Sequence, residues 1–195
     1  MLRESAAVSG YASATMMSAD FPKRARTALP ELDWTQALQQ QHRYRCWVWS
    51  ASDLATVGLA LARIARGLAL EAVLDWCLEP LADDTALCVA ELIGNAMTHG
   101  CREGHHPALS LGLRYFPTCC LLLEVGDPNP APPLLPSGAQ LETSDNMPTD
   151  GRGLVIIREL ADHLWWRRQG SGGKIVYARL DTPRYFAPLA GGHRG

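Results

Sequence analysis

The sequence predicts a two-layer α/β sandwich, in which a mixed, mainly antiparallel sheet carries helices on one face. Apolar residues recur at helical spacing in two segments before residue 100. Two pairs of strand-like segments follow, and a short turn joins the members of each pair. Helices with one apolar stripe and a sheet with one apolar face bury these surfaces by packing together, which gives two layers.

The size and composition of the chain suit a single domain with tails. Its 195 residues are enough for a core that needs no disulfide or metal for stability. The formal net charge of −2 provides no basic surface of the kind that attracts nucleic acid, so we expect no direct nucleic-acid partner. The cysteines form no CxxC pair and are interpreted as reduced core thiols: Cys46, Cys77, Cys88, Cys101, Cys119 and Cys120.

No segment of the sequence predicts secretion or membrane insertion. Residues 1–20 contain no apolar stretch behind a basic start, unlike a secretory signal. The richest apolar run, residues 54–70, includes Arg63 and Arg66, whose charges are costly inside a bilayer. We therefore expect no membrane partner and a cytoplasmic location.

The domain is expected at residues 42–181, between a leader and a tail. Residues 1–41 lack sustained periodicity and are rich in small and polar residues, which predicts a flexible N-terminal leader. Residues 182–195 are expected to form a C-terminal tail. Candidate functional residues are therefore sought between these two segments.

The domain is predicted to begin with a strand and a helix. Aromatic and β-branched residues favour a strand at residues 44–49. Ser52 or Asp53 can cap the helix that follows, and apolar residues recur at helical spacing from residue 54 to residue 68. This helix is expected to pack one face on the sheet.

A second helix is predicted to start near Asp83 or Asp84, either of which can cap it. It runs to about residue 98, and Gly100 supplies a residue suited to the position after a helix end. Most of its residues are apolar, so we expect it to be largely buried.

The second half of the domain is predicted to contain two hairpins separated by a loop and a helix. Strands are expected at residues 109–115 and 119–125, joined by a turn at residues 116–118. Residues 127–150 are rich in Pro, Ser, Thr and Asn, which predicts a long loop, interpreted as a lid.

A helix should then run from Gly151 to about residue 162. Two strands, near residues 164–168 and 174–180, follow it around a glycine-rich turn. Lys174, at the start of the last strand, is interpreted as a solvated strand residue.

Three polar residues stand at four-residue spacing on the second predicted helix. Glu91, Asn95 and His99 therefore line one face of a helix that is otherwise apolar. A carboxylate at this position can orient or deprotonate a nucleophile, and an amide oxygen can bind a hard cation such as Mg²⁺. Taken alone, the spacing also fits a solvent-facing stripe on an amphipathic helix.

The segment Glu-x-x-x-Asn-Ala-x-x-His-Gly at residues 91–100 resembles the N box of the GHKL ATPase superfamily, and specifically that of anti-sigma regulatory factors that are serine kinases. The resemblance covers residues 47–180 and implies a Bergerat-type ATP-binding fold. It implies that Glu91 is a general base and that Asn95 binds Mg²⁺ between the phosphates of ATP. A nucleotide-binding role is also assigned to His99.

Two further segments match the landmarks of this family. Asp127 ends a predicted strand, where the resemblance implies that it accepts a hydrogen bond from the adenine amino group. Gly151, Arg152, Gly153 and Leu154 open the helix after the lid, where glycines and free N–H groups suit a phosphate. Arg152 is a candidate contact for the γ-phosphate when the lid closes.

One segment departs from the family pattern. Superfamily members often carry Asp-x-Gly-x-Gly after the strand, whereas Asp127 is followed here by Pro128, Asn129, Pro130 and Ala131. The prolines remove two N–H donors and the segment lacks the conformational freedom of glycine. We therefore expect the adenine end of the site to be remodelled.

The resemblance implies a serine/threonine-protein kinase that uses ATP and Mg²⁺. Its implied partners are a sigma factor, which it holds inactive, and an anti-anti-sigma protein, which it phosphorylates. A homodimer is also among the assemblies we consider. The alternative is a nucleotide-sensing module that binds a partner and transfers no phosphoryl group.

A zinc site is the less favoured interpretation of the histidines and cysteine around residue 100. His99, Cys101, His105 and His106 fit no common zinc spacing, and they are expected to span a helix end and a loop. The position of His99 near a helix end is also explained by the helix dipole.

Overall fold

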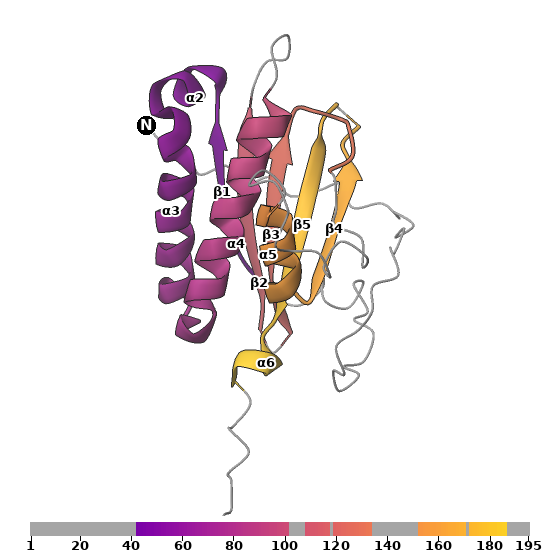
Figure 1. Cartoon of the computed structure of the whole chain (residues 1–195). Coiled ribbons are helices and arrows are strands. Elements are labelled where there is room, and N and C mark those ends of the chain that lie inside the picture. The colour runs from indigo at the N-terminus through magenta and orange to yellow at the C-terminus, as the bar shows by residue number, and fades with distance from the viewer. Residues whose placement is uncertain (1–41, 102–107, 118, 134–151, 171, 187–195) are drawn as a thin grey trace, which may run out of the picture.

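An antiparallel sheet of five strands forms one layer of the structure, in the order β1-β2-β3-β5-β4 (Figure 1). The computed structural model describes residues 42–101, 108–117, 119–133, 152–170 and 172–186. The strands are β1 (Arg43–Trp49), β2 (Leu109–Phe116), β3 (Cys120–Asp127), β4 (His163–Arg168) and β5 (Lys174–Asp181). All four strand pairs are antiparallel, so the described part of the sheet is not mixed.

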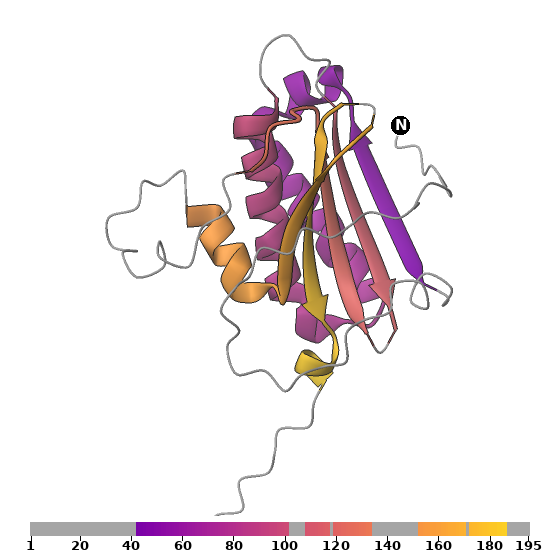
Figure 2. The ribbon, with the colours of Figure 1, turned by 90° about the vertical axis from the view of Figure 1, so that its right-hand side faces the viewer.

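Helices form the second layer and lie on one face of the sheet (Figure 2). The α-helices are α2 (Ala51–Val57), α3 (Leu61–Asp75), α4 (Ala82–Asn95), α5 (Arg152–Leu160) and α6 (Pro183–Phe186). Single 3₁₀ turns precede α3 and α4, and a π-helical turn at Ala96–Gly100 follows α4. The predicted fold class, a two-layer α/β sandwich with its helices on one face, is confirmed.

The first helix begins slightly earlier than expected. Ser50, and not Ser52 or Asp53, is the N-cap residue of α2, and its hydroxyl accepts a hydrogen bond from the backbone N–H of Asp53 at 3.4 Å. The Asp53 carboxylate in turn accepts a hydrogen bond of 2.8 Å from the backbone N–H of Ser50. Asp53 is therefore the N3 residue of a capping box, and Ser50 is its N-cap.

The start of α4 also differs from the prediction. Neither Asp83 nor Asp84 caps the helix, because Glu79–Leu81 already form a 3₁₀ turn that leads directly into it. Both aspartates instead lie in its first turn, where negative charge is favourable near the positive end of the helix dipole. At the other end, helical geometry continues as a π turn to Gly100.

The main core lies between the sheet and the helices. β3 is the central strand and all of its residues are buried. Leu111 on β2 and Leu123 on β3 are fully buried, and they share this core with Val89 and Ile93 of α4. Burial of these apolar side chains is the main favourable contribution to folding, and it fixes α4 over the centre of the sheet.

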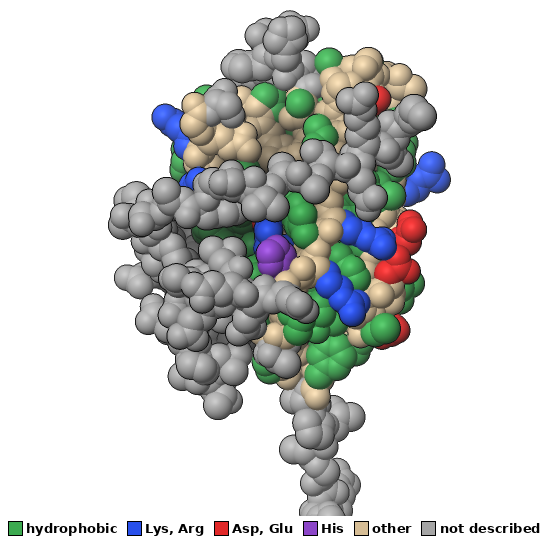
Figure 3. All heavy atoms as spheres, turned by 180° about the vertical axis from the view of Figure 1, so that it is seen from behind, with side chains coloured by type: hydrophobic (Ala, Val, Ile, Leu, Met, Phe, Trp, Pro, Cys, Tyr) green, Lys and Arg blue, Asp and Glu red, His purple; other side chains and the backbone are tan. Residues whose placement is uncertain are grey.

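The opposite face of the sheet carries a smaller apolar cluster that includes Phe116, Leu122 and Tyr177. Trp165 stacks on Tyr177 with ring centroids 5.1 Å apart. Apolar and basic side chains are both visible on this face in Figure 3. Ion pairs such as that between Arg114 and Glu124, at 3.1 Å, accompany the apolar groups there.

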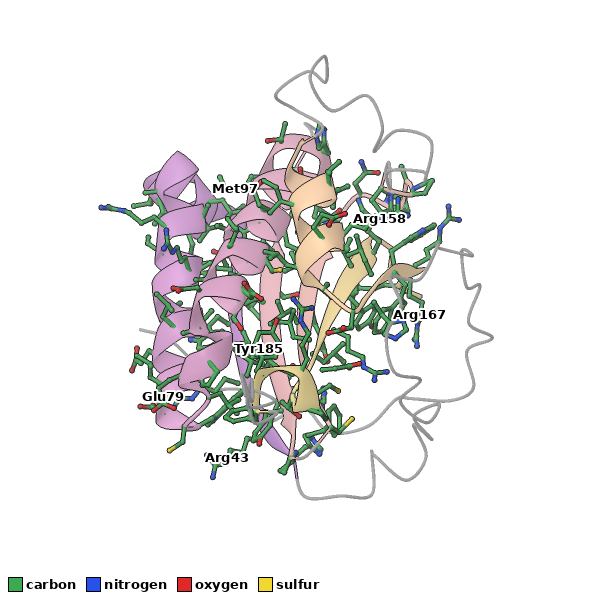
Figure 4. All side chains as sticks on the ribbon, turned by 60° about the horizontal axis from the view of Figure 1, so that its bottom comes forward. Arg43, Glu79, Met97, Arg158, Arg167 and Tyr185 are labelled. Carbon is green, nitrogen blue, oxygen red and sulfur yellow. The ribbon has the colours of Figure 1, made fainter. Side chains whose placement is uncertain are left out.

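Residues just beyond the predicted domain end are ordered against the helices. Tyr185 of α6 donates a hydrogen bond of 2.6 Å to Asp84 of α4 (Figure 4). Arg184 donates one of 2.8 Å to the carbonyl of Leu160, the last residue of α5. This short helix therefore links the start of α4 to the end of α5.

Several expectations concern residues that the structure does not describe. The leader at residues 1–41, most of the lid, residue 118 of the first hairpin turn and the last residues of the tail lie outside the described residues. Among the helices that are described, none combines the length and the apolar character needed to cross a membrane.

The position of Leu123 predicts its contribution to stability. Leu123→Ala should lower the free energy of unfolding by about 2–5 kcal/mol, because it leaves a cavity in the central strand. Val48→Ala on the edge strand β1 is the matched control: Val48 is 60% exposed, and its loss should cost less than about 1 kcal/mol. Urea unfolding of both variants measures the difference, and equal losses would contradict the assigned core.

Candidate functional site

Glu91 and Asn95 lie one turn apart on α4, and both face the start of α5. A Cβ atom built on Gly153, the second residue of α5, would collide with Glu91 Oε2 and lie 3.3 Å from Asn95 Nδ2. Gly153 is buried, and the two polar residues are half-buried. The structure therefore brings together three of the predicted site residues, and a larger residue at position 153 would displace the Glu91 carboxylate.

The side-chain amide of Asn95 has an unmet hydrogen-bonding need. Its Nδ2 atom is buried and has no hydrogen-bond partner among the described residues. A buried polar atom without a partner costs about 1–3 kcal/mol, so such an atom calls for an explanation. A half-turn of the amide group exchanges its nitrogen and its oxygen, so Asn95 can offer the site either a hydrogen-bond donor or a cation ligand.

The start of α5 supplies free backbone donors beside Glu91 and Asn95. The first N–H groups of a helix have no partner within it, and they carry partial positive charge that favours an anion. Leu154 is half-buried and packs against the main core, so what it can offer a ligand is its backbone N–H. Gly151 and the side chain of Arg152 lie outside the described residues.

The π turn after α4 brings Gly100 into direct contact with Asp127. A Cβ atom on Gly100 would lie 2.6 Å from Asp127 Cβ and 2.7 Å from its Cγ, distances that only glycine avoids. Asp127 is the last residue of β3, as predicted, and it is buried. Irregular π turns are frequent at functional sites, and this one sets the carboxylate of Asp127 against the end of the helix that carries Asn95.

Asp127 forms a buried ion pair with Lys174, the first residue of β5. Lys174 Nζ lies 2.9 Å from Asp127 Oδ1, and the side chains are 6% and 3% exposed. Burial raises the pKa of Asp127, whereas the hydrogen bond and the charge of Lys174 act in the opposite direction. Lys174 therefore helps to keep this carboxylate ionised.

The interpretation of Lys174 as a solvated residue is wrong. The strand register places it opposite Asp127, and it shares a face of β5 with the core residues Val176, Ala178 and Leu180. Side chains two residues apart on a strand lie on the same face, so the position of Lys174 two residues before Val176 was the signal for its burial.

Asn129, which the sequence analysis did not select, organises the segment after β3. Its backbone N–H donates to Asp127 Oδ1 at 2.9 Å, and its Nδ2 donates to the carbonyl of His99 at 2.7 Å. Its Oδ1 accepts the N–H of Ala131 at 2.9 Å. The segment after β3 is thus held by one side chain, which links β3 to the π turn. The imidazole of His99 is exposed, and its carbonyl makes the contact at this site.

Comparison with known proteins assigns this arrangement to a family. A family model described as a histidine kinase-like ATPase domain matches residues 50–180, which is more than half of the chain. The chain belongs to the histidine kinase-like ATPase domain family. Membership of this family implies ATP binding, generally with Mg²⁺. None of the curated proteins compared with the chain matches it.

The residues of this histidine kinase-like ATPase domain fit ATP and Mg²⁺. Phosphate oxygens suit the free N–H groups at the start of α5, and Gly153 leaves room for a close approach. Mg²⁺ prefers oxygen ligands, and the amide of Asn95 can present one. Within the described ranges, no three His, Cys, Asp or Glu residues gather to hold a metal, and His105 and His106 fall outside those ranges.

The contact between Gly100 and Asp127 predicts the effect of an added methyl group. Gly100→Ala should lower the free energy of unfolding by about 1–3 kcal/mol, because the new Cβ overlaps the base of the Asp127 side chain. Gly94→Ala on α4 is the matched control: its Cβ meets nothing within 4 Å. It should stabilise the helix by up to about 1 kcal/mol. Thermal or urea unfolding compares them, and stabilisation by both would contradict the close approach.

Proposed function

We propose that the chain is an ATP-dependent serine/threonine-protein kinase of the anti-sigma regulatory factor type. The observation that carries this proposal is the position of the Glu91 carboxylate. It faces the start of α5 and lies one turn from the buried Nδ2 of Asn95, which has no hydrogen-bond partner among the described residues. A base, a ligand for Mg²⁺ and backbone donors for the phosphates are recurring parts of phosphoryl-transfer sites. The sequence resemblance supports the same assignment.

Glu91 acts as the general base in this proposal. It takes the proton of a serine hydroxyl as the serine oxygen bonds to the γ-phosphorus, and the bond from that phosphorus to the leaving ADP oxygen breaks. Asn95 holds Mg²⁺, which neutralises charge on the phosphates. Gly153 and Leu154 bind the phosphates through backbone N–H groups, and Gly151 and Arg152 add further contacts to the phosphates. Asp127 accepts a hydrogen bond from the adenine amino group.

The proposed partners follow from this type of regulator. An anti-anti-sigma protein supplies the serine, and a sigma factor is the protein that the kinase holds inactive. We also propose a cytoplasmic location and keep a homodimer as the assembly to test. His99 is proposed to take part in nucleotide binding.

A nucleotide-sensing module without phosphoryl transfer is the second candidate function. The segment after Asp127 favours it, because Pro128 and Pro130 offer no N–H and Asn129 already uses its side chain and its N–H within the protein. In that case the site binds ATP, and its occupancy changes the affinity for a partner.

The role of Asn95 predicts a magnesium-dependent loss of affinity. Asn95→Ala should weaken ATP binding about tenfold or more when Mg²⁺ is present, and much less in EDTA, because it removes a ligand of the cation. Isothermal titration calorimetry in the two buffers makes the comparison. Thr98→Ala, an exposed position one turn further on, is the control. Absence of millimolar ATP binding by the folded wild type would overturn the proposed function.

Glu91 separates the two candidate functions. Glu91→Gln keeps the size of the side chain and removes the proton acceptor, so phosphoryl transfer should fall by a factor of about 10² or more. ATP affinity should change little. Labelled ATP and candidate anti-anti-sigma proteins measure the transfer, with Glu71→Gln on the exposed face of α3 as the control. Transfer at the wild-type rate would remove the catalytic role, and ATP binding without transfer would favour the sensing module.

A further inference from the structure

The buried ion pair between Asp127 and Lys174 has hydrogen-bonding capacity left over. An ammonium group has three hydrogens to donate. Nζ of Lys174 uses two of them, toward Asp127 Oδ1 at 2.9 Å and toward the carbonyl of Asn129 at 3.0 Å. No residue in the described ranges accepts the third. Since Lys174 is 5% exposed, this hydrogen is largely withdrawn from solvent as well.

Only one oxygen of the Asp127 carboxylate accepts hydrogen bonds from the described residues. Its Oδ1 atom accepts hydrogen bonds from Lys174 and from the backbone of Asn129. No donor among the described residues reaches Oδ2. The ion pair therefore presents one acceptor and one donor next to each other, and both groups are held in place by the contacts they already make.

The acceptor and the donor lie at the end of the site remote from α5. Asp127 packs against Gly100, which follows Asn95 by one π turn, whereas Glu91 and Asn95 face Gly153. A nucleotide with its phosphates at the start of α5 therefore has its base directed toward Asp127 and Lys174.

We infer that Lys174 is a specificity-determining residue, which donates a hydrogen bond to the ring nitrogen N1 of adenine while Asp127 Oδ2 accepts one from the N6 amino group. The inference rests on the proposed function, namely ATP binding. Adenine carries this acceptor and this donor side by side on its Watson–Crick edge. Guanine carries O6 and N1–H at the same positions, so it sets an acceptor against the carboxylate and a donor against the ammonium. Buried polar groups left without partners reject a ligand strongly, so this arrangement should exclude guanine.

The test compares nucleotides that differ by one group. In 1-deaza-ATP a C–H replaces N1 and every other hydrogen-bonding group is kept. Isothermal titration calorimetry of the full chain with Mg²⁺ should give an affinity about tenfold or more lower for 1-deaza-ATP than for ATP, and GTP should bind more weakly still. In Lys174→Met the ATP and 1-deaza-ATP affinities should be equal. Arg167→Met, on the neighbouring strand β4, is the control and should keep the wild-type ratio.

A spectroscopic measurement on the wild type covers the case in which Lys174→Met does not fold. The chain contains two lysines, Lys23 and Lys174, so the side-chain ¹⁵Nζ resonance of Lys174 can be assigned directly. It should shift on addition of ATP and shift much less with 1-deaza-ATP.

Each outcome decides the inference. Equal wild-type affinities for ATP and 1-deaza-ATP, or an unchanged ratio in Lys174→Met, would overturn the role of Lys174 and leave ATP binding intact. An ¹⁵Nζ resonance that responds equally to both nucleotides would overturn it too. Absence of any ATP binding would overturn the proposed function together with this inference.

Discussion

The site depends on how closely the backbone approaches the two ends of one face of α4. Gly153 allows the start of α5 to lie against Glu91 and Asn95, and Gly100 allows the end of the helix to lie against Asp127. Neither contact leaves room for a Cβ atom without moving a functional side chain. The carboxylate, the amide, the helix start and the buried ion pair are therefore held at fixed separations by two glycines, and the core beneath α4 keeps the helix in register with the sheet.

The sequence predicted the parts of this arrangement that depend on local periodicity. Glu91 and Asn95 share a face because helical spacing is set by the backbone, whatever lies around it. The strands expected at residues 119–125 and 174–180 were located from a continuous apolar run in the first case and from the glycine-rich turn before the second. These signals also sufficed for the fold class, because amphipathic helices and one-sided strands have few ways to bury their apolar surfaces.

The remaining features depend on partners that are distant in the sequence or on competition between neighbours. Lys174 and Asp127 are 47 residues apart, so no local pattern could pair them. The side chain of Asn129 reaches back 30 residues to the π turn. The predictions of the helix caps were wrong for a different reason. Ser50 and Asp53 exchange hydrogen bonds, which makes Ser50 the cap, and the 3₁₀ turn at Glu79–Leu81 leads into α4 without a cap at Asp83 or Asp84.

The contacts of α6 bear on how the chain tolerates change far from its nucleotide site. Tyr185 and Arg184 join the first turn of α4 to the last residue of α5, while Glu91 and Gly153 meet at the opposite ends of these two helices. α4 and α5 are therefore connected at both ends. Removing α6 would keep every site residue in the chain, but it would remove the contacts that Tyr185 and Arg184 make with α4 and α5. The α6 segment therefore supports the site from a distance, because it helps to hold the helix that carries Gly153.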